Sequence, residues 1–552
     1  MLRHGGRVLT DQLELQGVRR VYSVPGESFL AALDGLHDSG IENVVCRHEG
    51  GAAMMADAHG KLTGTPGVAF VTRGPGASNA AAGIHIASQD STPVILFVGQ
   101  VERGHRDREA FQELDYRAVF GSMAKWVGEI DSAERLPEYV SRAFHVAQSG
   151  RPGPVVLALP EDMLSAHADV SDIPARASVA PRVSATAVDA LVRHLAQARR
   201  PLVIAGGFAW SQQAAQDLAT FAERFDLPVA VTFRRQDRID NRHPHYAGDL
   251  GVGMNPRLAA RMAAADCLLV LGARLGDIAT GGYAHPDPAA PGCTILHVHP
   301  DPDETGRVFR PDLAVNAPAT EVVHALAQRT PESHPARAQW REAARAEYEA
   351  WITPVQTPGE VKLEQVMTWL SDALPEDAIA TNGAGNYAAW VHRYFRARSY
   401  PGQLAPTSGS MGYGFPAAIS AKLEHPDRTV VCFAGDGCFQ MTMNEFSTAC
   451  QHGAAVIVIL CNNGRYGTIR MHQEKTYPGR VSGTDLANPD YAALARAYGG
   501  HGETVLRTAD FAAAFGRARD AGVPAIIELQ LDPEALSPAM TLAATRRAAA
   551  GG

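Results

Sequence analysis

The sequence lacks the features that mark several protein classes. Its 552 residues contain no run of 18 apolar residues and no apolar signal segment near the N-terminus, which argues against a membrane-spanning or secreted protein. The net charge is −9 and the basic residues form no block, which argues against nucleic acid or an anionic membrane as a partner. The seven cysteines are scattered and form no CxxC pair, so they indicate neither a disulfide framework nor a zinc site. We therefore expect a cytoplasmic protein.

What the sequence does contain is an alternation of apolar runs and helical segments, in a chain too long for a single core. This alternation predicts parallel, doubly wound α/β domains. The expected strands are 18–24, 41–46, 67–72 and 93–98 in the first block, 201–205, 228–232, 267–271 and 294–298 in the second, and 429–434 and 454–461 in the third. The predicted domains are 1–165, 187–330 and 362–535. Between them lie an Ala/Ser/Pro-rich linker at 165–186 and a connector at 330–361 with a polar helix at 336–351, and the tail after Leu536 is expected to fray.

Two polar motifs in the third block follow two of these apolar runs. Gly435-Asp436-Gly437 comes directly after 429–434, and Asn462-Asn463 stands 24 residues later, after 454–461. Between them, Phe439, Met443, Phe446 and Cys450 are spaced to share one face of a helix over 439–452. In such a strand–helix–strand unit, Asp436 and Asn463 emerge at the carboxyl ends of neighbouring strands, where open α/β sheets bind ligands.

The residue types at these two motifs indicate a magnesium-diphosphate site. Gly435 and Gly437 allow the backbone to approach a phosphate closely, and the N-terminus of the following helix favours an anion. One Asp, one Asn and a backbone carbonyl suit Mg²⁺, which takes few protein ligands and completes its shell with phosphates and water.

The spacing GDG-x24-NN resembles the cofactor signature of thiamine diphosphate (ThDP) enzymes, and most of the chain resembles acetolactate synthases. The resemblance implies three α/β domains: an N-terminal domain that binds the pyrimidine, a middle domain, and a C-terminal domain that binds the diphosphate. It assigns Glu49, in Arg47-His48-Glu49, the carboxyl group that hydrogen-bonds N1′ of the aminopyrimidine, so that the coenzyme's 4′-imino group removes the C2 proton. The alternative is that Glu49 only lies in the first turn of a helix, where its negative charge interacts favourably with the helix dipole.

The resemblance also implies a set of further site residues. Gly409 would accept from the 4′-amino group, Met411 would wedge the coenzyme into its bent form, and Arg465 would give its backbone carbonyl to the metal. Gln112 would orient a ketoacid, unless it is a surface-loop residue. The catalytic set is Glu49 and Gln112, and the substrate-pocket set is Phe111 and His472. The cofactor-binding set is Pro25, Gly26, Asn386, Tyr387, Gly409, Met411, Gly435, Gly437 and Cys438, and the metal set is Asp436, Asn463 and Arg465.

Three departures from acetolactate synthases concern FAD and the substrates. The FAD-associated segment GxRFDDR reads Gly272-Ala273-Arg274-Leu275-Gly276-Asp277, and a usual lysine is Glu161. His472, able to titrate near neutrality, stands where the family has its specificity tryptophan; a solvent-facing loop histidine is the other interpretation. FAD binding and the usual pair of 2-ketoacids are therefore open. The tandem histidines of pyruvate decarboxylases are absent from the sequence.

The expected function is that of a ThDP- and Mg²⁺-dependent, acetolactate synthase-like enzyme. It would decarboxylate a 2-ketoacid and ligate the resulting enamine to a second carbonyl compound. A non-oxidative 2-ketoacid decarboxylase and a non-catalytic ThDP-binding protein are the alternatives. In the family, the glutamate and the metal site face each other across a subunit boundary, so the expected assembly is a homodimer or homotetramer.

Overall fold

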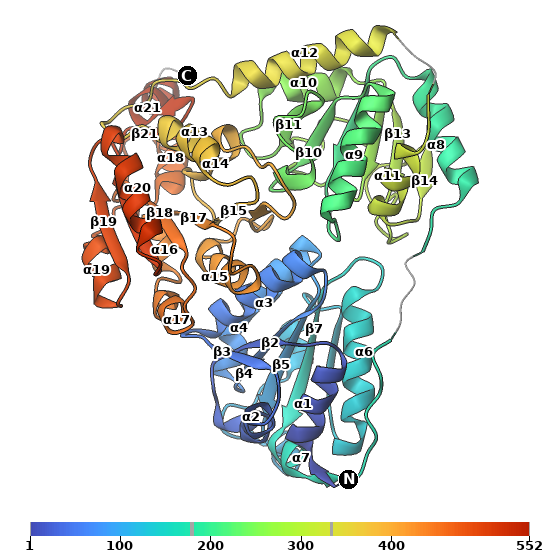
Figure 1. Ribbon diagram of the computed structural model, residues 1–552, viewed down its shortest axis with the longest axis vertical. Helices are drawn as coiled ribbons and strands as arrows, with labels where there is room; N and C mark the ends of the chain where they lie inside the picture. The colour runs from blue at the N-terminus through green and yellow to red at the C-terminus, as the bar shows by residue number, and fades with distance from the viewer. Residues whose placement is uncertain (1, 177–180, 332–334, 551–552) are drawn as a thin grey trace.

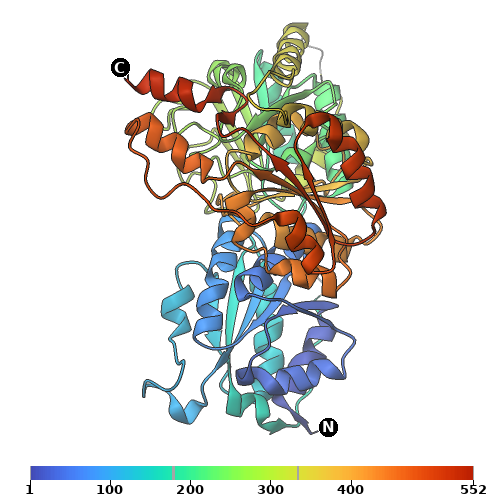
Figure 2. The same cartoon turned by 90° about the vertical axis from the view of Figure 1, so that its left-hand side faces the viewer.

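The computed structural model describes residues 2–176, 181–331 and 335–550, and it contains three six-stranded sheets whose strands all run parallel (Figure 1). Each sheet is covered by helices on both faces, and the N-terminal domain lies below the other two (Figures 1 and 2). The α/β fold class expected from the alternating pattern is confirmed. The ten strands expected from the apolar runs are present, each displaced by at most three residues at its ends.

The N-terminal domain is built from alternating helices and strands. Its strands β5 and β7 are buried along their whole length, which explains their continuous apolar sequences. Its elements are β1 (Arg3–His4), α1 (Gly5–Leu15), β2 (Arg20–Ser23), α2 (Leu30–His37), β3 (Glu42–Val45), α3 (Glu49–Thr63), β4 (Gly67–Val71), α4 (Pro75–Asp90), β5 (Val94–Gln100), α5 (Tyr116–Phe120), β6 (Trp126–Glu129), α6 (Leu136–Gln148), β7 (Pro154–Pro160), α7 (Glu161–Ser165) and β8 (His167–Ala168).

Strand β8 lies inside the segment expected to be a linker. It pairs antiparallel with β1 at the start of the chain, so the first part of 165–186 belongs to the N-terminal domain. Residues 177–180 of that segment lie outside the described residues.

The middle domain has the strand order β11-β10-β9-β12-β13-β14, which places the first and fourth strands of the domain side by side at its centre. Its elements are α8 (Ala185–Gln197), β9 (Pro201–Ala205), α9 (Gln212–Phe225), β10 (Val229–Thr232), β11 (Tyr246–Leu250), α10 (Pro256–Ala264), β12 (Cys267–Leu271), β13 (Thr294–Val298), β14 (Leu313–Val315) and α11 (Ala319–Ala327), and the expected polar helix follows as α12 (Pro335–Trp351).

The C-terminal domain has the order β16-β15-β17-β18-β20-β19. With the strands of each sheet numbered along the chain, this order and that of the N-terminal sheet, β3-β2-β4-β5-β7-β6, are both 2-1-3-4-6-5. Its elements are α13 (Leu363–Ala373), β15 (Ile379–Asn382), α14 (Ala388–Tyr394), β16 (Gln403–Leu404), α15 (Gly414–Glu424), β17 (Val430–Gly435), α16 (Asp436–Gln440), α17 (Glu445–Gln451), β18 (Ile457–Asn462), α18 (Gly467–Thr476), α19 (Tyr491–Ala497), β19 (His501–Val505), α20 (Phe511–Asp520), β20 (Ala525–Gln530), β21 (Ala535–Ser537), β22 (Met540–Thr541) and α21 (Leu542–Ala550).

Two expectations for this domain are wrong. The single helix over 439–452 is two short helices, α16 and α17, separated by a turn in which the Thr442 hydroxyl donates to the Gly412 carbonyl (2.7 Å). The tail after Leu536 does not fray, because β21 and β22 form a hairpin and α21 packs against α18. An ion pair between Arg546 and the fully buried Glu474 side chain (2.5 Å) fixes this helix.

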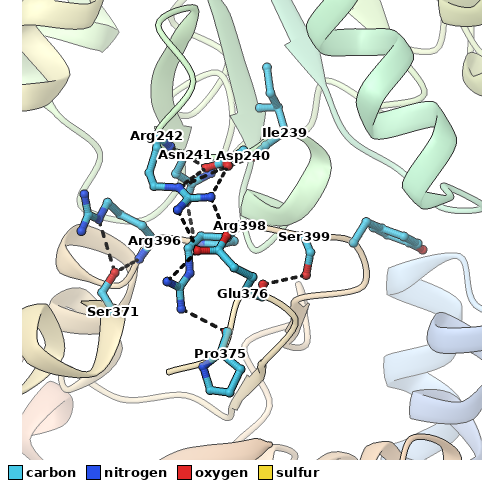
Figure 3. Close-up of polar contacts among 12 residues, drawn as sticks. Ile239, Asp240, Asn241, Arg242, Ser371, Pro375, Glu376, Arg396, Arg398 and Ser399 are labelled. Atoms are coloured by element: carbon cyan, nitrogen blue, oxygen red, sulfur yellow. Dashed lines mark hydrogen bonds and ion pairs between the residues drawn. The ribbon is translucent and has the colours of Figure 1, made fainter. Parts of the chain in front are cut away.

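Polar contacts join the middle and C-terminal domains close to β10 and β15 (Figure 3). Asn241 and Ala397 exchange two hydrogen bonds of 2.9 Å, one through the backbone of Asn241 and one through its side chain. Beside them, Arg242 forms an ion pair with Glu376 (2.6 Å), as Figure 3 shows. The domains therefore dock through specific polar pairs as well as through apolar packing. No described helix is both long and apolar enough to cross a bilayer.

Candidate active site

A cavity of about 240 Å³ lies at the carboxyl ends of the C-terminal strands β17 and β18. Its described lining comes from residues between Leu363 and Ala535, so in a single chain it belongs to the C-terminal domain alone. The structure brings together around it Asn386, Tyr387, Gly409, Met411, Gly435, Asp436, Gly437, Cys438, Asn463 and Arg465.

The three residues expected to bind a metal stand on adjacent strands. Asp436 follows β17 and Asn463 follows β18. The backbone N–H groups of Gly464 and Arg465 donate to Asn462 Oδ1 (3.0 Å) and Asn463 Oδ1 (3.3 Å) and lie close to the Asp436 carboxylate. Burial raises the pKa of Asp436, whereas these N–H groups and the Asn488 side chain oppose that shift. A divalent cation is the partner that favours a buried carboxylate in its charged form.

Glycine is needed on both sides of Asp436 because a larger residue would meet a neighbouring aromatic ring. A Cβ atom on Gly437 would lie 2.6 Å from the Tyr466 ring, and one on Gly435 would lie 3.0 Å from the Tyr387 ring. Within the described ranges there is no cluster of three or more His, Cys, Asp or Glu side chains placed to hold a metal. The expected donors, one carboxylate, one amide and one carbonyl, are the hard oxygens that Mg²⁺ accepts, and their small number leaves room for phosphate oxygens.

Residues 407–413, which we call the coenzyme loop, contribute two residues to the lining of the cavity. Gly409 adopts a left-handed backbone (φ 68°), and Gly409 and Met411 both line the cavity. The neighbouring Asn386 side chain accepts from the Thr468 hydroxyl (2.9 Å). The Tyr387 hydroxyl instead accepts from the backbone N–H of Gly383 (3.1 Å), so its ring rather than its hydroxyl faces the space above Gly435.

Glu49 is the first residue of α3 and is only 9% exposed. Its Oε2 accepts from the Asn79 side chain (2.9 Å), and its Oε1 lies 3.1 Å from the position that a Cβ on Gly76 would take. Glu445 of the C-terminal domain accepts from the backbone N–H of Arg47 (3.1 Å), which fixes the turn leading into α3. Glu49 is not part of the lining of the C-terminal cavity in the same chain.

The segment expected to contact substrate is an exposed, strained loop of the N-terminal domain. Phe111 is 73% exposed, and Gln112 has a positive φ of 65°. Arg73, which is almost buried, donates from Nε to the Phe111 carbonyl (3.3 Å) and forms ion pairs with Glu161 (2.8 Å) and Glu27 (2.9 Å). The glutamate that replaces the family's lysine, at the end of β7, is therefore paired with the arginine that follows β4, with β5 between the two strands.

The remaining predicted residues lie away from the cavity. His472 is exposed on α18 and does not line it. Pro25 is also exposed, and Gly26 packs against Thr72, where a Cβ would approach to 2.5 Å.

Several residues that support this site could not be recognised from the sequence. Asn488 donates from one amide group to Asp436 Oδ2 (2.7 Å) and to Asn462 Oδ1 (2.8 Å), which fixes both motifs from a distant turn. Thr468, Glu445 and Asn79 likewise act through partners that only the fold brings near.

Comparison with known proteins identifies the family. Three family descriptions match: the N-terminal TPP binding domain of thiamine pyrophosphate enzymes at residues 3–119, their central domain at 188–326 and their C-terminal TPP binding domain at 383–529. The chain belongs to the thiamine pyrophosphate enzyme family.

Curated relatives refine this result. The chain is 31% identical over 537 residues to the acetolactate synthase isozyme 2 large subunit of Escherichia coli K12, covering 96% of each chain. It is 34% identical over 516 residues to the acetolactate synthase large subunit of Parasynechococcus marenigrum WH8102, covering 90% of this chain and 82% of that one. A probable acetolactate synthase large subunit of Methanocaldococcus jannaschii is 30% identical over 554 residues, covering 97% and 93%. The expected resemblance is confirmed: the chain is an acetolactate synthase-like, ThDP-dependent enzyme.

Proposed function

We propose that this enzyme uses ThDP and Mg²⁺ to decarboxylate a 2-ketoacid and to join the product to a second carbonyl compound. The observation that carries the proposal is the single cavity lined by the glycines, the buried Asp436 and the Asn463 side chain at the ends of adjacent strands. Its chemistry fits a cation–diphosphate pair, as argued above. The acetolactate synthase names of the relatives support the choice of a carboligation.

In this proposal the C-terminal domain anchors the coenzyme. Asp436, Asn463 and the Arg465 carbonyl hold Mg²⁺, while Gly435, Gly437 and Cys438 face the diphosphate. Gly409 would accept from the 4′-amino group of the aminopyrimidine, and Met411 would hold the coenzyme in its bent form. When bound, ThDP supplies a carbon nucleophile at C2 and a sink for the electrons left when CO₂ departs.

At the other end of the coenzyme, the Glu49 carboxyl group would hydrogen-bond N1′ of the aminopyrimidine. Its Oε2 is occupied by Asn79, so Oε1, beside Gly76, is the oxygen left for N1′ of the pyrimidine. Because the carboxyl group is nearly buried, its hydrogen bond to N1′ is little weakened by water. Pro25 and Gly26 form the turn that borders this end.

Phe111, Gln112 and His472 form the substrate side of the proposal. Gln112 donates to the ketoacid, Phe111 shields the reacting carbon from water, and His472 contacts the acceptor. The exposure of Phe111 and His472 in one chain is the exposure expected of side chains that a second subunit covers.

We therefore propose a homodimer or a homotetramer in which Glu49 of one subunit serves the C-terminal cavity of another. The test is to mix Glu49→Gln with Asp436→Ala, each inactive alone. Random reassortment gives mixed dimers with one intact site, and activity should return to about a quarter of the parental value. If activity does not return although subunits exchange, the sites are not shared.

FAD does not fit the middle domain as it stands. The cavity at the ends of its strands holds about 170 Å³, which is less than the 240 Å³ of the C-terminal cavity, although FAD is a larger coenzyme than ThDP. A ligand as long as FAD would also need the adjoining cavity of about 330 Å³, and with it a new position for Arg235, which lines both and donates to the Gly207 carbonyl (3.2 Å). A colourless purified protein is expected, and bound flavin absorbance would contradict this.

The reaction itself is tested by a panel of 2-ketoacids scored for CO₂ release, with and without an acceptor carbonyl compound. A ligated product supports the proposal, and a free aldehyde with every acceptor would assign the enzyme as a simple decarboxylase. No turnover with bound ThDP would indicate a non-catalytic protein. We place the enzyme in the cytoplasm, since its seven cysteines are all free thiols, most of them buried.

A further inference from the structure

The coenzyme loop is attached at both ends to the N-terminal domain of its own chain. Thr407 begins the loop and Tyr413 ends it, immediately before α15. Figure 1 shows α15 beside α3, and the attachments come from α3 and from the end of α4. These contacts are separate from the role of Glu49, which lies at the opposite end of α3.

At the start of the loop, Thr407 is hydrogen-bonded to Asp90. The last residue of α4, Asp90 accepts at one carboxylate oxygen from the Thr407 backbone N–H (2.8 Å) and from its hydroxyl. Its other oxygen accepts from Lys61, and Arg235 of the middle domain lies 3.7 Å away. The Asp90 side chain has no exposure to solvent.

At the end of the loop, the Tyr413 hydroxyl sits between two charged residues of α3. It donates to Asp57 (2.7 Å) and accepts from Lys61 (3.0 Å), and Lys61 also pairs with Asp57 (2.8 Å). Tyr413 and Asp57 are fully buried. Lys61 therefore links both anchor points, because the same ammonium group contacts Asp90, Asp57 and Tyr413.

Such a network is costly to bury unless its geometry is kept, since two carboxylates and two cations have left water. A buried network of this kind holds its members in one arrangement, and any displacement of Thr407 or Tyr413 removes a hydrogen bond from a buried carboxylate. Gly409 and Met411 lie between these two fixed points and line the cavity.

We propose that Asp57, Lys61 and Asp90 are positioning residues that set the coenzyme loop in its binding geometry. This inference rests on the proposed coenzyme site. It gives the N-terminal domain a second task, since it shapes the cavity of its own chain in addition to supplying Glu49.

The test uses changes in the loop that leave the buried charges in place. Thr407→Val removes one hydrogen bond to Asp90, and Tyr413→Phe removes the hydroxyl shared by Asp57 and Lys61. Each is expected to weaken ThDP binding, in the presence of Mg²⁺, by about tenfold, with a larger change in the KM for ThDP than in kcat at saturating coenzyme. Binding is measured by calorimetry and stability by Tm.

The matched control is Arg20→Met, which breaks another contact between the N-terminal and C-terminal domains, at the C-terminal end of α15. Arg20 pairs with Glu424, the last residue of α15, and donates to the Leu423 carbonyl (3.1 Å). It should lower Tm while ThDP affinity stays within twofold of the parental value.

Two outcomes would overturn the inference. In one, the loop variants lower Tm as Arg20→Met does but bind ThDP normally; in the other, all three variants weaken ThDP equally, which would indicate general domain docking. Failure of the parental enzyme to bind ThDP at all would instead refute the proposed function.

Discussion

The N-terminal and C-terminal domains share one strand order but carry opposite chemistry at the carboxyl ends of their strands. In the C-terminal domain, the third and fourth strands of the sheet end in Asp436 and Asn463, which face a glycine-lined cavity. In the N-terminal domain, the second strand ends at the turn into α3, where Glu49 is bound by Asn79 rather than by a cation. In the proposed function, the C-terminal domain holds an anion through a metal, and the N-terminal domain presents a single carboxyl group.

The difference shows that topology decides where a ligand binds and loop residues decide what is done to it. In the proposed function, the carboxyl edge of the C-terminal sheet anchors the coenzyme, because glycines and hard oxygens follow its strands. The carboxyl edge of the N-terminal sheet handles the proton, because a buried acid begins a helix there. The comparison separates binding from activation, and variants in the two domains should separate them as well.

The largest expected effect comes from Glu49→Gln. Activation is lost because an amide cannot share a proton with N1′, so exchange of the coenzyme C2 proton should slow by about 10²–10⁴-fold. ThDP affinity should change little, because the anchoring residues are in the other domain. Exchange is followed by NMR with deuterium and affinity by calorimetry.

The control for that variant is Glu102→Gln, a half-exposed carboxylate of the same domain, which should exchange at the parental rate. Parental exchange in Glu49→Gln would show that another group activates the coenzyme. Loss of affinity together with exchange would show that the two domains do not divide the tasks.

Asp436→Ala should have the reverse effect. Removal of the carboxylate from the metal site is expected to weaken Mg²⁺-dependent ThDP binding by at least about 100-fold. Asp427→Ala, at the exposed turn before the same strand β17, is the control and should bind normally. Equal affinity in the two variants would exclude Asp436 as a metal ligand.

The two domains also differ in how much of their site the sequence predicted. The anchoring residues are contiguous glycine and Asp/Asn motifs that directly follow apolar runs, so pattern and chemistry coincide in a short segment. The structure places those residues around one cavity. The N-terminal residues are scattered over several strand ends, and Glu49 was identified only through resemblance to a family.

What the sequence did not predict depends on contacts between distant segments. The break between α16 and α17 follows from the bond of Thr442 to Gly412, which periodicity cannot detect. Asn488 is an ordinary turn residue until the fold brings it to Asp436. The ordered tail depends on a buried Glu474 that looks like any helical surface residue in sequence.

A smaller effect is expected from Gly437→Ala. The added Cβ would stand 2.6 Å from Tyr466, so the ring must move or the turn must shift, and ThDP affinity should fall by about tenfold. Gly516→Ala is the contrasting change, because nothing lies within 4 Å of its Cβ and helix α20 gains a better helix former. It should raise Tm slightly. Unchanged affinity in Gly437→Ala would mean that the backbone there does not approach the diphosphate.

The smallest effect on coenzyme binding is expected from a change at the boundary between the N-terminal and middle domains. Arg151 pairs with the buried Glu304 (2.8 Å) across the boundary to the N-terminal domain, and Arg274 and Arg307 remain near Glu304 when Arg151 is removed. Arg151→Met should therefore lower Tm by about 5 °C and leave ThDP affinity and C2 proton exchange unchanged. A loss of either coenzyme property would mean that this boundary shapes the active site, either through Glu304 of the middle domain or through Ser91, next to Asp90, to which Arg151 donates (2.8 Å).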